Sequence, residues 1–550
     1  MIITPQPPAR LVLSFPFDKD TNALVSRALG AKYTGKLKKW WCHDTVLNRD
    51  TLFKLFPDLE GIEQEVTYPP IFDMPGYLMD HQKWAVEIAK DFPRWGYFYD
   101  TGTGKTLCGI EIYRMLRIKT LVLCPLEIIK EAWIDDIAQF APGIKAASLH
   151  GIKPARLPQI VKDNDIVLLN FESFKKYRPL LEKTNISMLM IDESSKLKNN
   201  KAMVTKEVSK YAENMTHTYL FSGTPAPNSD EEYFSQIACL DPSLFGKSFY
   251  RFREIFFYPS GYGGFKWKMR PDMRQEFLDK LASISSVVNK NDVLDLPERT
   301  YNKIAVSLSP DEKKTYEQMR KDLIAEIDEE EIEANNAAVK VMKLRQVTAG
   351  FLIDENKQPH YIGKSKLTAL CNLLEEIGDH QVLIWTQFTY EAEQIMKALG
   401  NKAGLINGSV PHGPRRTEAL TNFKTDITPY LVAHPKTIQH GITLVNCTYA
   451  IYYSLNNSHE QHKQTKDRIY RKGQHNACTY YYLVVPGSVD EDIYQDLQRK
   501  KKNADDTTNF IKMHKRETNP RIIEKFMLSQ ERKKDEGKKT FIDFLRTKRI

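Results

Sequence analysis

The stretch 96-GYFYDTGTGKT-106 decides how the rest of the chain is interpreted. It opens with a short aromatic run typical of a buried strand and ends in Gly102, Gly104, Lys105 and Thr106. Glycines let backbone N–H groups wrap a phosphate at the start of the following helix. The lysine would reach the β and γ phosphates of ATP, and the threonine hydroxyl would ligate Mg²⁺. A full Walker loop would also have glycine where this chain has Tyr99.

Two acids at the end of a later apolar run support this interpretation. The stretch 188-MLMIDESS-195 contains Asp192 and Glu193 at the end of a predicted strand. An acid beside a phosphate loop can hold Mg²⁺ through water, and a neighbouring glutamate can orient and deprotonate the attacking water. We assign the first role to Asp192 and the second to Glu193. The alternative is that these acids cap a following helix.

Two arginines far downstream are candidates for completing the site. Arg468 and Arg471 belong to 464-QTKDRIYRKGQ-474, and their spacing places both on one face if the segment is helical. Facing a nucleotide held by another unit, they would act as arginine fingers that stabilise charge on the transferring phosphoryl group. A solvated basic helix face is the alternative.

Short apolar runs alternate with longer mixed segments, which is typical of strand–helix–strand units in a parallel sheet. One series of runs is 120-TLVLC, 166-IVLLN, 188-MLMI and 219-YLFS, and a second is 381-QVLIW, 403-AGLI, 430-YLVA, 449-YAIYYS and 480-YYYLVV. The fold class is therefore α/β, with two similar units. We expect a small N-terminal domain at 1–68, unit one at 69–240, a helical insertion or linker at 241–345, unit two at 346–498 and a basic helical tail at 499–550.

The composition favours a globular protein. A chain of 550 residues needs more than one core, since single cores stop growing near roughly 250–300 residues. The 41% hydrophobic and 27% charged residues argue against disorder. No apolar run approaches the ~18 residues of a membrane span, and no secretory signal is evident, so we expect a cytoplasmic protein of a bacterium or infected host cell. The cysteines form no C-x-x-C pair and indicate no zinc site.

The positive charge is concentrated near the C-terminus. Residues 499–550 contain 17 Lys or Arg and 8 Asp or Glu, and this difference of +9 equals the formal net charge of the chain. Such asymmetry suggests an acidic polymer as partner, with a solubilising tail as the alternative.

Taken in order, these motifs resemble those of the Swi/Snf-type family of superfamily 2 helicase-like ATPases. The similarity extends over about 75–495 and also includes 77-YLMDHQKWA, 119-KTLVLCP, 170-NFESF, 220-LFSGTPAPN, 293-VLDLPE, 344-LRQ and 382-VLIWTQF. The D-E-S-S form of the acidic motif is similar to that of short bacteriophage chains of this type.

The resemblance implies two RecA-like lobes that close on ATP and Mg²⁺, so that chemistry is coupled to lobe motion. Catalytic residues would be Lys105, Glu193, Arg468 and Arg471. Nucleotide-binding residues would be Gln82, which would read adenine, and Thr101, Gly102, Thr103, Gly104, Lys105, Thr106, Asp192 and Gly441, with Thr106 and Asp192 serving the metal. In 440-HGITL, Thr443 replaces the polar amide usual in the family, which leaves that contact open.

The resemblance also implies DNA as the partner. The DNA-contacting residues would be Pro125, Asn170, Ser222, Gly223, Thr224, Thr386 and Gln387, in loops at the far ends of strands. Backbone N–H groups and hydroxyls suit phosphate contacts, so binding should be independent of sequence and should weaken with salt. Ser222 and Thr224 are also suited to capping a turn around Pro225.

The N-terminal stretch 11-LVLSFPFDKDTNALVSRALGAKYTGKLKKWWC-42 resembles the HARP-type domain that precedes the motor in annealing helicases. Trp40 and Trp41, with Lys36, Lys38 and Lys39, would present an aromatic and cationic surface to a DNA junction. The alternative is that the tryptophans form the core of a small domain.

We therefore predict a monomeric ATP-dependent DNA translocase that acts on duplex or branched DNA in remodelling or annealing, with DNA repair or recombination as its setting. An RNA-directed helicase is one alternative. A non-catalytic, nucleotide-gated DNA clamp is another, although a clamp would not need Lys105, Glu193 and Arg471.

Overall fold

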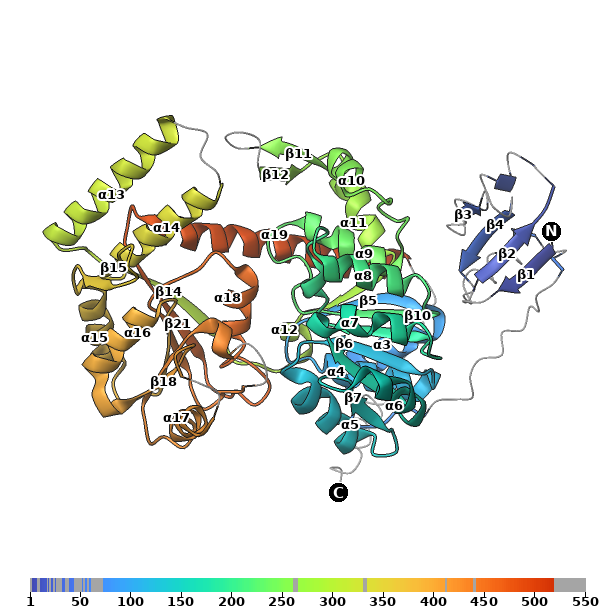
Figure 1. The fold of residues 1–550 in the computed structure, drawn as a ribbon, viewed down its shortest axis with the longest axis horizontal. Helices are drawn as coiled ribbons and strands as arrows, with labels where there is room; N and C mark the ends of the chain where they lie inside the picture. The colour runs from blue at the N-terminus through green and yellow to red at the C-terminus, as the bar shows by residue number, and fades with distance from the viewer. Residues whose placement is uncertain are drawn as a thin grey trace, which may run out of the picture.

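The computed structural model describes residues 73–260, 266–329, 334–410, 413–438 and 442–518, together with parts of 2–60. These residues form two lobes, each built on a parallel sheet, that lie side by side (Figure 1). The α/β fold class with two sheet units is therefore confirmed.

Lobe 1 is built on a parallel sheet with the strand order β13-β5-β10-β9-β6-β8-β7. Its central strands are almost wholly apolar because helices cover both faces of the sheet. Its strands are β5 (Arg94–Tyr99), β6 (Thr120–Cys124), β7 (Ala146–Ser148), β8 (Ile166–Asn170), β9 (Met188–Asp192), β10 (His217–Phe221) and β13 (Ser285–Val288). Its helices include α3 (Asp80–Asp91), α4 (Lys105–Leu116), α5 (Asp135–Phe140), α6 (Leu157–Asp163), α7 (Phe171–Leu181), α8 (Met203–Ala212), α9 (Tyr233–Leu240), α10 (Phe249–Phe256) and α11 (Arg274–Ala282).

Lobe 2 has the parallel order β14-β21-β20-β17-β19-β18. Its strands are β14 (Arg299–Ala305), β17 (Val382–Trp385), β18 (Ala403–Ile406), β19 (Tyr430–Ala433), β20 (Tyr449–Tyr452) and β21 (Cys478–Val484). Its helices include α13 (Pro310–Glu329), α14 (Ala334–Thr348), α15 (Ser365–Ile377), α16 (Thr389–Leu399), α17 (Pro414–Lys424) and α18 (His459–Lys466). All nine apolar runs read as strands overlap strands of the two sheets.

The segment 241–345, expected to be a helical insertion or linker, contributes a strand to each sheet. β13 pairs with β5 in lobe 1, and β14 pairs with β21 in lobe 2. The chain crosses between the lobes through the short helix α12 (Lys290–Val293). β13 begins with Ser285 and Ser286, and β14 is a largely polar edge strand, so neither produces the apolar run that identified the other strands. A hairpin of β11 (Phe257–Ser260) and β12 (Lys266–Met269) precedes them.

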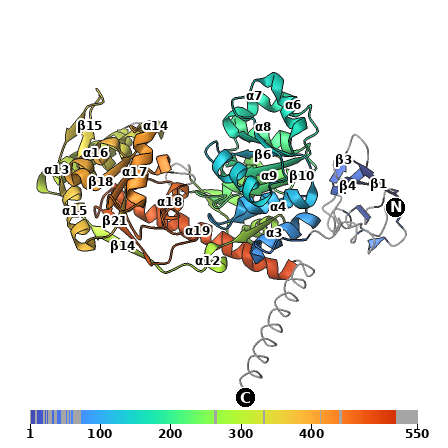
Figure 2. The same ribbon diagram turned by 90° about the horizontal axis from the view of Figure 1, so that it is seen from below.

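The last described helix, α19 (Val489–Thr518), links the two lobes. Its first turns pack Val489, Ile493 and Leu497 into the core of lobe 2. Farther along, Ile511 is fully buried in the core of lobe 1. Figures 1 and 2 show this red helix running from one lobe to the other. The part of the predicted basic tail up to residue 518 is therefore helical and packs on lobe 1 through Ile511, and residues 519–550 lie outside the described residues.

A small antiparallel sheet precedes lobe 1, with the order β1-β2-β4-β3. Its strands are β1 (Ile2–Gln6), β2 (Arg10–Ser14), β3 (Lys32–Thr34) and β4 (Lys39–His43). Trp40 packs against a core that contains Leu11 and Leu13, which agrees with the reading of this tryptophan as a core residue. Lys39 is exposed, whereas Lys36, Lys38 and the side chain of Trp41 lie outside the described residues.

Among the described helices, none combines the length and the apolar character needed to cross a bilayer.

Candidate functional site

The phosphate loop turns sharply between β5 and α4. Gly102 and Gly104 have φ angles of 85° and 81°, in the left-handed region that glycine adopts without strain. A Cβ atom on Gly104 would lie 2.1 Å from Nε2 of Gln82, so a larger residue would displace that side chain. Helix α4 begins at Lys105, which places its first N–H groups at the loop, as anion binding requires.

Two side chains from the start of α3 contact the Thr103 carbonyl of the phosphate loop. Nε2 of Gln82 donates to the Thr103 carbonyl at 3.1 Å, and Nε2 of His81 contacts the same oxygen at 2.8 Å. The side-chain carbonyl of Gln82 also accepts a hydrogen bond from the Met79 N–H at 2.9 Å. The buried Gln82 amide therefore supports the loop in this conformation, and its contact with adenine stays a prediction.

The Lys105 ammonium group lies at the mouth of the loop. It donates to the carbonyl oxygens of Tyr99 at 3.1 Å and Asp100 at 3.3 Å. Neutral carbonyls are weaker partners for an ammonium group than phosphate oxygens are. Lys105 is therefore free to exchange them for the β and γ phosphates of a nucleotide.

The predicted acids lie at the end of β9. Asp192 is buried, and its carboxylate accepts hydrogen bonds from Nε1 of Trp133 at 2.9 Å and from the Glu193 N–H at 3.0 Å. Burial and the neighbouring Glu193 raise the pKa of Asp192 to about 6, against the opposing charge of Lys105. Glu193 has a φ of 57°, which is uncommon outside glycine and typical of functional sites.

These residues fit a magnesium-bound nucleotide. Asp192 is a buried carboxylate whose ionised form is penalised by burial, and a cation would offset that penalty. Thr106, the second residue of α4, is the candidate hydroxyl ligand. The described residues contain no group of three or more His, Cys, Asp or Glu that could hold a metal ion. A cation held chiefly by substrate phosphates and water needs no such cluster.

The arginine pair of lobe 2 faces lobe 1. Helix α18 ends at Lys466, so Arg468 and Arg471 lie in the turns that follow and not on a continuous helix face. A Cβ atom on Gly102 would lie 3.8 Å from Cβ of Arg471, which places this arginine against the phosphate loop. Burial and the charge of Arg471 lower the pKa of Arg468 to about 10, while the charge of Glu193 acts in the opposite direction. The solvated-face alternative therefore does not apply to Arg468, which is 4% exposed.

Both arginines are held by lobe 2. Arg468 donates to the carbonyls of Gln464 and Ile442, each at 3.1 Å. Arg471 donates to the Thr443 hydroxyl at 2.8 Å, so the threonine that departs from the family pattern orients this guanidinium group. Gly441 lies outside the described residues.

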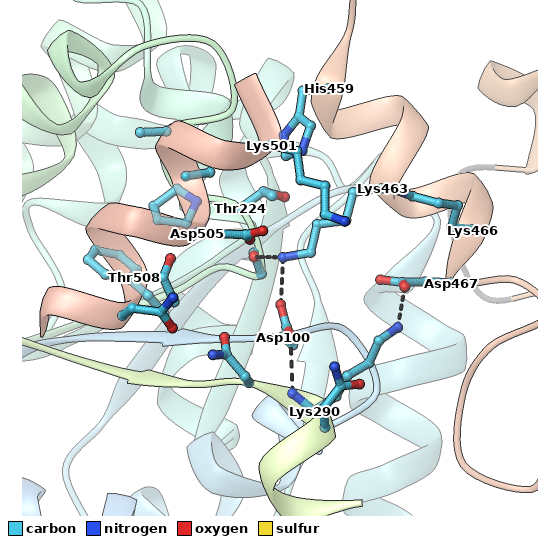
Figure 3. Close-up of a pocket in the computed structure, with 18 of the residues that line it drawn as sticks. Asp100, Thr224, Lys290, His459, Lys463, Lys466, Asp467, Lys501, Asp505 and Thr508 are labelled. Carbon is cyan, nitrogen blue, oxygen red and sulfur yellow. Dashed lines mark hydrogen bonds and ion pairs between the residues drawn. The ribbon is translucent and has the colours of Figure 1, made fainter. Parts of the chain in front are cut away.

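An ion pair joins the phosphate loop to α18. Nζ of Lys463 lies 2.5 Å from the Asp100 carboxylate and donates to the Gly223 carbonyl at 2.8 Å (Figure 3). Although burial opposes it, Lys463 holds the pKa of Asp100 below its usual value. The Asp100 carbonyl accepts a hydrogen bond from Lys105. Asp100 therefore contacts both Lys105 of the phosphate loop and Lys463 of lobe 2.

Further polar contacts hold the lobes together. Lys290 of α12 pairs with Asp467, and both side chains are buried. Lys198 pairs with Glu460 of α18 at 2.5 Å, and the Ser195 hydroxyl donates to the same glutamate at 3.2 Å. The two lobes are thus in contact in this structure, with the arginine segment beside the phosphate loop.

The predicted DNA contacts all lie at carboxyl ends of strands, but most are engaged internally. Pro125, Asn170, Ser222, Thr224 and Thr386 are buried. The Asn170 amide donates to Glu172 at 2.8 Å, and the Ser222 hydroxyl accepts from the Thr224 N–H at 3.2 Å, as expected for a turn cap. The Gly223 carbonyl faces Lys463. Gln387 is half-buried and accepts from Asn456 at 3.0 Å.

The sequence interpretation missed Asp100, Lys463 and Lys290. Asp100 lies inside the phosphate-loop stretch 96–106, and Lys463 directly precedes the arginine segment 464–474. Both residues therefore belong to or adjoin motifs that the sequence already indicated. The partners Asp100 and Lys463 are 363 residues apart, and no local periodicity connects them.

Comparisons with known proteins agree with this arrangement. The SNF2-related domain family matches residues 38–350, and the helicase conserved C-terminal domain family matches residues 365–473. A protein named p41 from Acyrthosiphon pisum secondary endosymbiont phage 1 is 24% identical over 451 residues, which cover 78% of this chain and 96% of that protein. The predicted likeness to phage proteins is thereby confirmed.

Two longer relatives match over about half of their own length. The Caenorhabditis elegans homolog of SWI/SNF-related matrix-associated actin-dependent regulator of chromatin subfamily A-like protein 1 is 24% identical, over 73% of this chain and 57% of the relative. Mouse chromodomain-helicase-DNA-binding protein 1-like is also 24% identical, over 73% of this chain and 46% of its own length. The Sulfolobus solfataricus SWI2/SNF2 ATPase core in complex with dsDNA aligns with 81% of this chain and 97% of its own, at 20% identity and a TM-score of 0.37.

Proposed function

Because this chain belongs to the SNF2-related family, we propose that it is an ATP-dependent DNA translocase whose two lobes together form the hydrolysis site. The observation that carries the proposal is the position of Arg471 of lobe 2 against Gly102 of the phosphate loop. One chain supplies both halves of the site, so a monomer suffices for turnover.

Each residue has a role that follows from its position. The loop N–H groups and Lys105 bind the β and γ phosphates, and Glu193 orients and deprotonates the attacking water. Arg468 and Arg471 stabilise the charge that develops on the transferring phosphoryl group. Bound Mg²⁺, held by Thr106 and by Asp192 through water, would neutralise phosphate charge. Once the phosphoryl group has left, the arginines lose their anionic partner, which favours separation of the lobes.

DNA is the polymer favoured by the family and by the names of the relatives of this chain, which include a helicase-DNA-binding protein. The loops at the strand ends, near Pro125, Asn170 and Gln387, are the proposed contact surface. The internal hydrogen bonds of Asn170 and Gln387 must exchange for contacts with phosphates when DNA binds. Contacts of this kind carry no base information, so binding is independent of sequence.

The direct test is the rate of ATP hydrolysis by the purified full-length chain with duplex DNA, single-stranded DNA or structured RNA. We expect duplex DNA to stimulate turnover more than RNA does. Stimulation by RNA alone would favour the RNA-directed alternative. Absence of stimulation by any polymer would contradict the proposal.

A further inference from the structure

A second polar space lies between the lobes, next to the phosphate loop. It has a volume of about 420 Å³, within the range of about 300–1,000 Å³ typical of small-ligand sites. Its walls come from Asp100 and the turn at 223–226 of lobe 1, from α12, and from α18 and α19 (Figure 3). Residues 101–106 do not line it, so it is separate from the phosphate loop itself.

Cations outnumber acids along these walls. The charged lining residues are Lys290, Arg299, Lys463, Lys466 and Lys501 against Asp100, Asp292, Asp467 and Asp505. Among them, Asp100 pairs with Lys463 and Asp467 with Lys290. The buried His459 carries no charge at neutral pH, because burial lowers its pKa to about 3.

Lys466 and Lys501 approach one aromatic ring. Their Nζ atoms lie 5.5 Å and 5.3 Å from the centre of the Tyr301 ring. Lys466 is only 8% exposed, and within the described part of the chain its Nζ makes no hydrogen bond or ion pair. Burial and the charge of Lys501 lower the pKa of Lys466 to about 7. The charge of Asp467 acts in the opposite direction but does not offset the burial of Lys466. An anion between the two lysines would remove the remaining cost.

Neutral hydrogen-bond donors complete the lining. The lining also includes residues whose side chains carry neutral donors: Thr224, Thr508, Asn289, Asn291 and Asn509. Hydroxyl, amide and ammonium donors together match the oxygen acceptors of a small tetrahedral anion. A DNA duplex is too wide for a space of this volume, so a small anion is the better match.

Asp100 lies in the wall between the cavity and the phosphate loop. The carbonyl of Asp100 accepts from Lys105 on the nucleotide side, while its carboxylate pairs with Lys463 at the cavity. Gly223 on the same wall packs against the loop, since a Cβ atom there would lie 3.2 Å from the Thr101 nitrogen. The phosphate loop and the cavity therefore share this wall.

We propose that this interlobe cavity binds inorganic phosphate through Lys466 and Lys501, and that the phosphate released by ATP hydrolysis occupies it. That the phosphate comes from ATP hydrolysis rests on the proposed function, whereas the binding of phosphate to the cavity does not. Bound phosphate would bridge lobe 2 and α19.

The test is calorimetric titration of inorganic phosphate into the nucleotide-free full-length protein at constant ionic strength. The variants are Lys105→Ala, Lys466→Gln, Lys501→Gln and the control Lys500→Gln. Lys500 neighbours Lys501 on α19, but its Nζ donates to the Asn457 carbonyl at 2.7 Å and does not line the cavity. We expect phosphate affinity to fall at least about tenfold in Lys466→Gln and in Lys501→Gln, and to persist in Lys105→Ala and Lys500→Gln.

Loss of binding in Lys105→Ala alone would place phosphate only at the nucleotide loop and would overturn the proposal. Absence of binding to the wild-type chain, or displacement of phosphate by duplex DNA, would do the same. Lys466→Gln should also unfold at a higher temperature than wild type in phosphate-free buffer, because it removes a charge whose burial Asp467 offsets only in part. These measurements require no ATP turnover, so they can succeed or fail independently of the translocase proposal.

A second arm tests the source of the anion. Added phosphate should slow steady-state ATP hydrolysis by the wild type, and Lys466→Gln should need at least about tenfold more phosphate for the same inhibition. Equal inhibition of both proteins would show that product phosphate does not use the cavity.

Discussion

Arg471 is the residue on which the split site depends most. Its Cβ lies beside Gly102 of the phosphate loop although Arg471 belongs to lobe 2, and Thr443 fixes its guanidinium group. We expect Arg471→Ala to lower DNA-stimulated turnover by about 10³-fold or more, the range known for arginine fingers, with ATP and DNA binding largely kept. Lys472→Ala, at the exposed neighbouring position, is the matched control. Wild-type turnover by Arg471→Ala would show that Arg471 is a structural residue.

Lys105 and Glu193 should fail in different ways. Lys105→Ala removes the ammonium group that would bind phosphates, so we expect loss of both ATP affinity and turnover. Glu193→Gln keeps the shape of the side chain but not its basicity, so it should bind ATP and stall before hydrolysis. Equilibrium binding of a fluorescent ATP analogue, measured beside turnover, separates the two effects. Normal turnover by Glu193→Gln would favour the clamp alternative.

Asp192 should make the nucleotide-free protein less stable at neutral pH. Its pKa is raised from 3.8 to about 6, so the ionised form is disfavoured in the folded state. The resulting destabilisation is absent below about pH 4, grows as the pH rises towards 6, and is constant above that. We expect Asp192→Asn to exceed wild type in free energy of unfolding by on the order of 2 kcal/mol at pH 7.5, with little difference near pH 4. Denaturant titration at both pH values measures this, and a variant less stable than wild type at pH 7.5 would contradict it.

At the scale of elements, the contact between the phosphate loop and α18 couples the lobes. We expect Asp100→Asn and Lys463→Gln each to lower kcat/KM for ATP about tenfold, because either change removes one charge of a half-buried ion pair that joins the lobes. The kcat/KM of the double variant should be no lower than that of the less active single variant, since the second change acts on an ion pair that is already broken. The Lys303–Glu491 pair at 3.0 Å lies within lobe 2 and provides the control cycle, in which kcat/KM should not change. Additive losses at Asp100 and Lys463 would show that the two residues act separately.

Elements with strong apolar patterns were predictable, and edge elements were not. The buried strands β6, β8 and β9 are continuous apolar runs because both of their faces are covered. β14 alternates between half-buried and exposed positions at a sheet edge, so its sequence resembles a loop. The end of α18 at Lys466 was also not evident, because Arg468 and Arg471 continue the i, i+3 spacing through the turns.

The nucleotide site was more predictable than the DNA surface for a physical reason. Phosphate chemistry demands particular residue types at fixed local spacing, as in Gly102, Gly104 and Lys105. Contacts with a DNA backbone use main-chain groups and hydroxyls that many loops offer. Pairings such as Asp100 with Lys463 depend on how two distant lobes meet, which local sequence does not encode.

For the whole molecule, α19 changes the meaning of the basic C-terminal segment. A solvated tail would contribute charge alone, but α19 buries Leu497 in lobe 2 and Ile511 in lobe 1. The Thr507 hydroxyl also donates to Asp230 of lobe 1 at 3.1 Å. Any change in the angle between the lobes must therefore bend α19 or break its contact with one of the two cores.

The central claim is that ATP-driven closure of two lobes moves this chain along duplex DNA. Displacement of a third DNA strand from a triplex tests it most directly, because release requires movement along the duplex as well as hydrolysis. We expect the wild-type chain to release the third strand only with ATP and Mg²⁺, and Glu193→Gln to release none. DNA-stimulated ATP hydrolysis by the wild type with no release of the third strand would contradict the claim.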